Sequence, residues 1–165
     1  MALGKDSLAV SHAQNDPFEL QRFVAAQNGI YDVALEELRR GSKRSHWIWF
    51  IFPQVAGLGS SAMSERYAIK SKREALAYLN HPILGARLKE CTNALLAVAG
   101  RTAEDVMGRP DDLKLRSSMT LFAAVSAAGS PFHEILERYF SGSCDDRTID
   151  YLARDESKET EPDVN

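Results

Sequence analysis

SHWIWFIFPQVAGLGSSAMSERY, residues 45–67, is the stretch that decides how this chain folds. Its first half contains a dense aromatic run, WIWFIF at residues 47–52, which holds both tryptophans of the protein. From Pro53 onward the stretch turns to glutamine, glycine and serine. Because folding removes apolar surface of this kind from water, we expect the core to form around the aromatic run. We expect a binding site where the stretch becomes polar.

The length and composition of the chain are typical of one soluble globular domain. It has 165 residues, of which 44% are hydrophobic, and its formal net charge is -3. This balance disfavours stable nucleic-acid binding, which usually requires a basic surface. The chain begins without a signal-peptide pattern, and no apolar run reaches the roughly 18 residues of a membrane span. We therefore expect no membrane partner.

The cysteines and histidines predict neither a metal site nor a cofactor. Cys91 and Cys144 lie in no CxxC or Cys/His ligand spacing, and the four histidines are not spaced as ligands of one ion. Cys91 falls on the apolar stripe of an expected helix and is interpreted as a buried thiol. Such cysteine usage fits a reducing, cytoplasmic setting.

The hydrophobic periodicity predicts an all-α fold, a single compact domain of about eight short helices. Capping signals support several helix starts, notably Ser71 with Glu74 and Thr102 with Asp105. The expected helical segments are 17–29, 32–40, 64–69, 72–80, 82–100, 102–108, 110–127, 132–140 and 146–153.

Three segments lack a helical period. The aromatic run has no alternation, so its pattern fits either a buried strand or a buried helix. Its helical neighbours favour a short helix or an extended buried turn. Residues 1–14 show no period, and residues 155–165 are polar and acidic. We expect a disordered N-terminal segment and a disordered acidic tail around a domain at residues 15–154.

The polar half of the opening stretch is the first candidate site. Small residues and amides in a loop can present backbone N–H groups to an anion, and a helix that begins at Ser64 would favour a phosphate. The alternative is a tight turn in which Ser64 is only a helix cap. The candidate ligand-binding residues here are Gln54, Gly57, Gly59, Ser60 and Ser64.

A second candidate lies in the segment LKLRSSM, residues 113–119. Lys114 and Ser118 are four residues apart and share one helical face. With Arg116 nearby, this face could bind a phosphate or a carboxylate. The alternative is a solvated helix face, against which the two adjacent serines, poor residues for a helix interior, count slightly.

Two further groups are weaker candidates. Glu65, Tyr67 and His46 could perform acid–base chemistry beside the loop, although a surface glutamate and a core tyrosine are the simpler interpretation. The acidic pair at residues 111–112 is expected to serve only the N-terminus of its helix.

Long motifs resemble a known family. The segments SHWIWFIFPQ, YLNHPILGARL, GRTAEDVMG and PDDLKLRSSMTLF together look like the bacterial family of unknown function numbered 1810, some of whose members were labelled calpastatin-like. The resemblance covers residues 17–152. It implies a small all-α fold and supplies no established reaction, and no calpain-inhibitor repeat is seen in the sequence.

Shorter motifs are similar to the NADAR family, which is associated with ADP-ribose derivatives. The sequence SERY at residues 64–67 resembles its S-E-H-Y motif, but departs from it at Arg66. The resemblance implies that Glu65 is a catalytic acid/base and that Trp47 or Trp49 stacks on a base. It also implies that Lys114, Arg116 and the glycine loop hold phosphates.

Two hypotheses follow. In the first, the chain binds a nucleotide-like, phosphate-bearing small molecule or an ADP-ribose derivative, and in its finer form it is an N-glycosidase or other hydrolase that acts on an ADP-ribose-modified substrate. Alternatively, it is a non-catalytic helical interaction or regulatory module, which predicts an exposed apolar patch larger than a few hundred Å². The sequence leaves the substrate, the reaction and the oligomeric state open.

Overall fold

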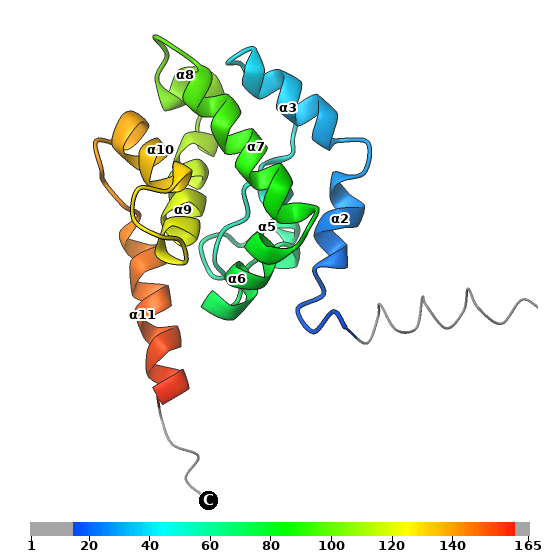
Figure 1. Cartoon of the computed structure of the whole chain (residues 1–165), viewed down its shortest axis with the longest axis vertical. Coiled ribbons are helices and arrows are strands. Elements are labelled where there is room, and N and C mark those ends of the chain that lie inside the picture. The colour runs from blue at the N-terminus through cyan, green and yellow to red at the C-terminus, as the bar shows by residue number, and fades with distance from the viewer. Residues whose placement is uncertain (1–14, 161–165) are drawn as a thin grey trace, which may run out of the picture.

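A computed structural model describes residues 15–160, which form ten α-helices (Figure 1). The all-α expectation is confirmed, since the extended pairing in this part of the chain is an isolated bridge between Val55 and Ile69. The helices are α2 (Gln21–Gln27), α3 (Tyr31–Arg39), α4 (Ile48–Ile51), α5 (Ala62–Arg66), α6 (Lys72–Asn80), α7 (Leu84–Ala97), α8 (Ala103–Met107), α9 (Asp111–Ala124), α10 (Pro131–Phe140) and α11 (Asp146–Thr160).

Helix α9 lies at the centre of the packing. It contacts α4, α6, α8, α10 and α11, and most of its residues are buried. A row of aromatic rings crosses the core beside it, with centroids 5.1 Å apart for Phe23 and Tyr78, 5.4 Å for Tyr78 and Phe122, and 5.8 Å for Phe122 and Phe132. The row ties α2 and α6 to α9 and α10, so the core is one continuous unit.

The capping signals at Ser71 and Thr102 are confirmed. The Ser71 hydroxyl accepts the Glu74 amide, and Thr102 with Asp105 forms a reciprocal capping box. Helix α2, however, begins at Gln21 rather than at Pro17. Glu19 has a φ of 53°, which breaks the helical path, and the Asp16 carboxylate caps the amide of Gln21 across this turn.

The aromatic run is held in place by a buried carboxylate. One oxygen of Glu37, on α3, accepts hydrogen bonds from the amides of Arg44 and Ser45 at 2.7 and 2.6 Å and from Nε1 of Trp47 at 3.2 Å. Burial raises the pKa of Glu37, but these donors outweigh it and the pKa lies below its usual value. The run then forms the single turn α4, which resolves the sequence ambiguity in favour of a short buried helix.

Helix α11 extends past its expected end at Ala153 as far as Thr160, which corrects the predicted disorder at residues 155–160. The Asp155 carboxylate accepts the amide of Lys72 at 3.0 Å, and Glu156 pairs with the Lys72 side chain. The tail is acidic because it docks against the N-terminus of α6, where acids are favoured. The predicted disorder at residues 1–14 and 161–165 lies outside the described residues.

Candidate functional site

The glycine loop at residues 53–61 is anchored at both ends. The Ile69 amide donates to Gln54 O at 2.8 Å, and the Ala56 amide donates to Ile69 O at 2.9 Å. Farther along, a Cβ atom on Gly59 would lie only 2.6 Å from Ser64 Oγ, so the loop packs tightly on α5 there. Between these anchors, Gly57 has a φ of +85° and open space around it. The loop can therefore bend at Gly57 without losing its anchors.

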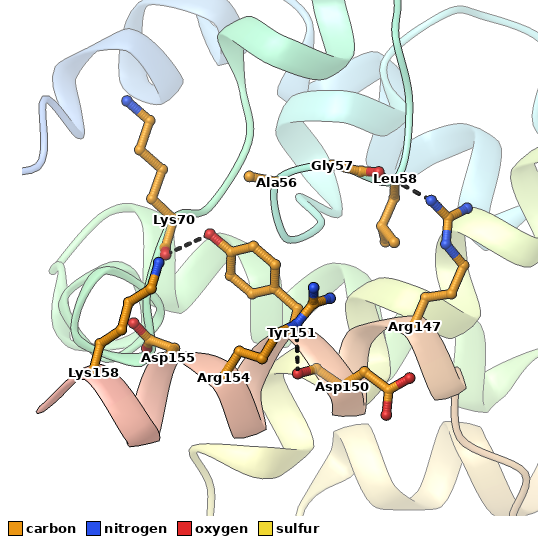
Figure 2. Close-up of a pocket in the computed structure, with 10 residues that line it drawn as sticks. All are labelled: Ala56, Gly57, Leu58, Lys70, Arg147, Asp150, Tyr151, Arg154, Asp155 and Lys158. Carbon is orange, nitrogen blue, oxygen red and sulfur yellow. Dashed lines mark hydrogen bonds between the residues drawn. The ribbon is translucent and has the colours of Figure 1, made fainter. Parts of the chain in front are cut away.

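A groove of about 490 Å³ lies between this loop and α11 (Figure 2). Its volume falls within the roughly 300–1,000 Å³ of small-molecule sites. The lining residues are Ala56, Gly57, Leu58, Lys70, Arg147, Asp150, Tyr151, Arg154, Asp155 and Lys158.

The wall that α11 contributes is cationic. Arg147, Tyr151, Arg154 and Lys158 are spaced i, i+4, i+7 and i+11, so they lie on one helix face, and the two cationic ends are about 16 Å apart along the axis. Arg147 donates to Gly57 O at 3.0 Å. Figure 2 shows the guanidinium groups of Arg147 and Arg154 rising from α11 toward the loop.

The groove cations form no salt bridge with the described residues. Ten salt bridges join described residues, and none of them includes Lys70, Arg147, Arg154 or Lys158. Asp155 is occupied by the Lys72 amide. With four cations against the two carboxylates of Asp150 and Asp155, the lining of the groove has an excess of positive charge.

Tyr151 is fixed in the middle of the groove. Its hydroxyl donates to Lys70 O at 2.7 Å, and burial raises the pKa of its phenol. This contact spans from α11 to the chain just before α6. The tyrosine therefore sets the width of the groove and stays neutral at physiological pH.

A second, smaller hollow lies on the other side of the loop, with a volume of about 10 Å³, room for one water molecule. Lys114 Nζ lies 5.2 Å from the centroid of the Trp49 ring that borders it. Lys114 of α9 therefore approaches the same tryptophan that the glycine loop borders, although Lys114 does not line the hollow. The hollow is lined by Trp49, Gln54, Val55, Leu58, Gly59, Ser64 and Tyr67.

Trp47 cannot contact a ligand, which corrects its assignment as a stacking platform. Its side chain is fully buried, and its Nε1 is bonded to Glu37. Trp49 is the half-buried tryptophan beside the loop. Ser64 is likewise not the helix cap, because Ser61 is the N-cap of α5 and accepts the Ser64 amide. Ser64 lies inside α5 and does not present the helix N-terminus to an anion.

The predicted phosphate-binding face of α9 is dispersed. Ser118 is fully buried, and its hydroxyl has no partner among the described residues. Arg116 turns toward Asp145 at 3.9 Å, and Lys114 lies 3.6 Å from Asp111. None of the three lines the α11 groove. This part of the sequence prediction is corrected because α9 is buried on too many sides to present one free polar face.

Glu65 is exposed on α5 and lines a separate hollow with Arg22, Arg66 and Glu74. Lys70 lines both this hollow and the α11 groove, so the two adjoin there. The residues that the sequence suggested as partners of Glu65 do not gather around it. Tyr67 is buried against Phe23 and Phe50 with ring centroids 5.7 and 5.4 Å away, whereas His46 and Ser60 are exposed.

Sequence reasoning missed the cations of α11. Their spacing of seven and then four residues from Arg147 was a detectable signal. Ending the expected helix at Ala153 excluded Arg154 and Lys158 from it and so hid the stripe.

Other kinds of site find no support in the part of the chain that the structure describes. No group of three His, Cys, Asp or Glu side chains within residues 15–160 is arranged to hold a metal ion. Cys91 is buried in α7, where burial raises its pKa to about 12. None of the described helices has the length and apolar character needed to cross a membrane.

Comparison with known proteins assigns the family and leaves the activity open. The conserved hypothetical protein Rv1873 from Mycobacterium tuberculosis, whose crystal structure was determined at 1.38 Å, is 54% identical, with a TM-score of 0.82 over 84% of this chain and 99% of that one. No curated protein matches. Neither the NADAR likeness nor the calpastatin-like label gains support. The model of a family described as protein of unknown function, DUF1810, matches residues 17–152, and the chain belongs to that family.

Proposed function

We propose that this protein binds a phosphate-bearing small molecule of about nucleotide size in the groove between the glycine loop and α11. The observation that carries the proposal is that the four cations lining the groove form no salt bridge with a described residue and outnumber the two carboxylates, Asp150 and Asp155, that line it with them. Phosphate oxygens form strong charge-assisted hydrogen bonds with guanidinium and ammonium groups.

The position of the acids on α11 supports this interpretation. Arg154 and Lys158 are like charges at i, i+4, a spacing that destabilises an isolated helix by about 0.2–0.5 kcal/mol. Asp150 could offset this repulsion, yet Figure 2 draws its carboxylate pointing away from the loop. An anion between Arg154 and Lys158 would remove the repulsion.

An ADP-ribose derivative is one candidate within this class, and hydrolysis is a finer hypothesis. The hollow that contains Glu65 adjoins the groove at Lys70, so a long ligand that crosses Lys70 would approach the carboxylate. This geometry is compatible with Glu65 as an acid/base. The phosphate groups, however, are assigned to α11 rather than to Lys114 and Arg116.

The alternative, a non-catalytic interaction module, has less support. It requires a contiguous apolar patch on the surface. The exposed large apolar side chains in the described part of the chain number six, at most two from any one element, namely Ile30 before α3, Val33 on α3, Leu76 on α6, Ile83 before α7, Leu113 on α9 and Ile149 on α11.

Titration calorimetry with pyrophosphate, AMP and ADP-ribose tests the proposal. The double variant Arg154→Ala/Lys158→Ala removes two charge-assisted contacts, each about 1.5–3 kcal/mol, and should weaken binding of each ligand by more than about tenfold. A control, Arg44→Ala/Lys89→Ala, removes the same charge from exposed positions outside the groove and should leave affinity within about twofold.

Two results would overturn the proposal. One is the absence of binding heat with all three ligands at millimolar concentration. The other is an equal loss of affinity in the groove variant and in the control, because it would mean that only the net charge of the protein matters.

A further inference from the structure

Leu58 separates the two hollows, since it lines both the α11 groove and the small hollow beside Trp49. We infer that Leu58 is a movable partition, and that a ligand whose phosphate lies along α11 inserts a heteroaromatic ring behind it. This inference rests on the proposed function of the groove. It identifies the ligand class as phosphate esters that carry a ring with a hydrogen-bond acceptor.

One residue that lines the hollow behind Leu58, Trp49, carries a buried hydrogen-bond donor without an acceptor in the described part of the chain. Nε1 of Trp49 is buried and has no partner among the described residues, and such orphaned buried donors are uncommon in folded proteins. Lys114 covers one face of the indole at 5.2 Å. The edge of the indole that carries Nε1 is therefore the part assigned to the ligand.

The other side chains of the hollow suit a planar ring. Gln54 and Ser64 supply polar groups, while Tyr67 and Val55 supply apolar surface. A heteroaromatic ring combines apolar faces with acceptors at its edge, which matches this lining. A sugar phosphate also offers oxygen acceptors, but it has no flat apolar face to lie against Tyr67 and Val55.

The loop is built so that Leu58 can move. The bridge to Ile69 anchors the chain before Gly57, and the close packing of Gly59 on Ser64 anchors it afterwards. Gly57 lies between these anchors, with a φ of +85° and no atom within 4 Å of the position of a Cβ. The turn at Gly57 and Leu58 can therefore rotate while both flanks stay in place.

Phosphate binding and ring binding are coupled through Arg147. Its guanidinium donates to Gly57 O at 3.0 Å and so holds the turn that carries Leu58. A phosphate in the groove competes with this carbonyl for the same guanidinium, because charged acceptors form stronger hydrogen bonds than neutral ones. Arrival of the phosphate thus loosens the turn, and the hollow of about 10 Å³ opens to admit the ring.

The experiment compares AMP with ribose 5-phosphate, which has no heteroaromatic base, by calorimetry and tryptophan fluorescence. We expect AMP to bind about tenfold more tightly, the effect of one stacked and hydrogen-bonded base. AMP should also change the fluorescence of the wild-type protein but not that of Trp49→Phe. The remaining tryptophan, Trp47, is fully buried and bonded to Glu37, so its emission should not respond.

Variants of Leu58 test the partition itself. Leu58→Ala increases the population of the open state and should tighten AMP binding severalfold, with no change for ribose 5-phosphate. Leu58→Phe makes the partition bulkier, so the affinity for AMP should fall to the affinity for ribose 5-phosphate. Circular dichroism and thermal unfolding verify that each variant is folded.

The outcomes separate the partition from the groove. Equal wild-type affinities for the two probes, or an equal response of both to Leu58→Ala, overturn the ring site. If that equal binding is still lost in Arg154→Ala/Lys158→Ala, the groove stands and only the partition falls. If neither probe binds the wild-type protein, both proposals fall.

Discussion

The Glu37 corner and the α11 groove use charge in opposite ways. One oxygen of Glu37 accepts three hydrogen bonds from the protein itself, and these contacts bury Trp47. Along α11, Arg147, Arg154 and Lys158 form no salt bridge with any described residue. A charged group that is hydrogen-bonded by the protein itself contributes to the fold, whereas a charged group without a salt bridge at a groove remains available to a ligand.

The contrast extends through the stretch at residues 45–67. Its aromatic half is hydrogen-bonded to Glu37 of α3 and packs in the core, while its glycine half lines the groove. Changes in the first half should therefore reduce stability, and changes around the second half should alter binding. The following predictions test this division, beginning with the largest expected effect.

Replacing Trp47 should cause the largest loss of stability. Trp47→Ala leaves a cavity in the core and removes one donor from Glu37, so the free energy of unfolding should fall by about 3–5 kcal/mol. Urea unfolding followed by circular dichroism measures it. Trp49→Phe, a change at the half-buried tryptophan beside the glycine loop, is the matched control and should cost less than about 1.5 kcal/mol. Similar losses at the two positions would break the comparison.

Neutralising Glu37 should cost less and should depend on pH. Glu37→Gln exchanges a charged acceptor for a neutral one and should reduce stability by about 2 kcal/mol at pH 7. The folded-state pKa of Glu37 is lowered, so its stabilisation is present above the unfolded-state pKa and is lost as pH falls through the folded-state value.

Unfolding free energies of wild type and Glu37→Gln should therefore converge in acid. Glu36→Gln is the control, because Glu36 is exposed and its salt bridge among the described residues is with Arg40, the C-cap of the same helix; it should change stability by no more than about 0.5 kcal/mol. A difference between wild type and Glu37→Gln that stays constant down to strongly acidic pH would contradict the role given to the carboxylate.

A smaller effect is expected at Gly57. Gly57→Ala forces a β-carbon into left-handed backbone and should cost about 1–2 kcal/mol. Gly100→Ala has a similar φ of +70° and equally open surroundings, so it should cost about as much. The two should differ in pyrophosphate titrations, where only Gly57→Ala disturbs the carbonyl that Arg147 binds. Equal affinities for the two variants would argue against a role for this turn.

The smallest change in stability is expected along α11. Arg154→Ala/Lys158→Ala removes no salt bridge between described residues, so the free energy of unfolding should change by no more than about 0.5 kcal/mol. A loss above about 2 kcal/mol in urea unfolding would assign these cations to the fold rather than to a ligand.

The sequence predicts the fold well because its signals are local. The caps at Ser71 and Thr102 depend on residues three positions away, and the apolar stripe that contains Cys91 depends on helical spacing. The aromatic run predicts the core through its composition alone. It does not reveal which tryptophan is buried, because that choice depends on Glu37, a residue of another helix.

The candidate site was only half predictable for the same physical reason. The composition of the glycine loop, with Gly57 and its neighbours, indicates a site from the sequence alone. The opposite wall of the groove comes from α11, far along the chain. The last turns of α11 contain no apolar stripe and are held by Asp155 to Lys72, 83 residues away. Pattern reasoning assigned this polar segment to a disordered tail, and long-range docking overrode the pattern.

A crystal structure of the protein with pyrophosphate tests the central claim most directly. The account predicts the ligand between Ala56–Leu58 and α11, with its oxygens within hydrogen-bond distance of Arg154 and Lys158. Pyrophosphate bound at saturation elsewhere on the surface, with the α11 groove unchanged and empty, would contradict the account.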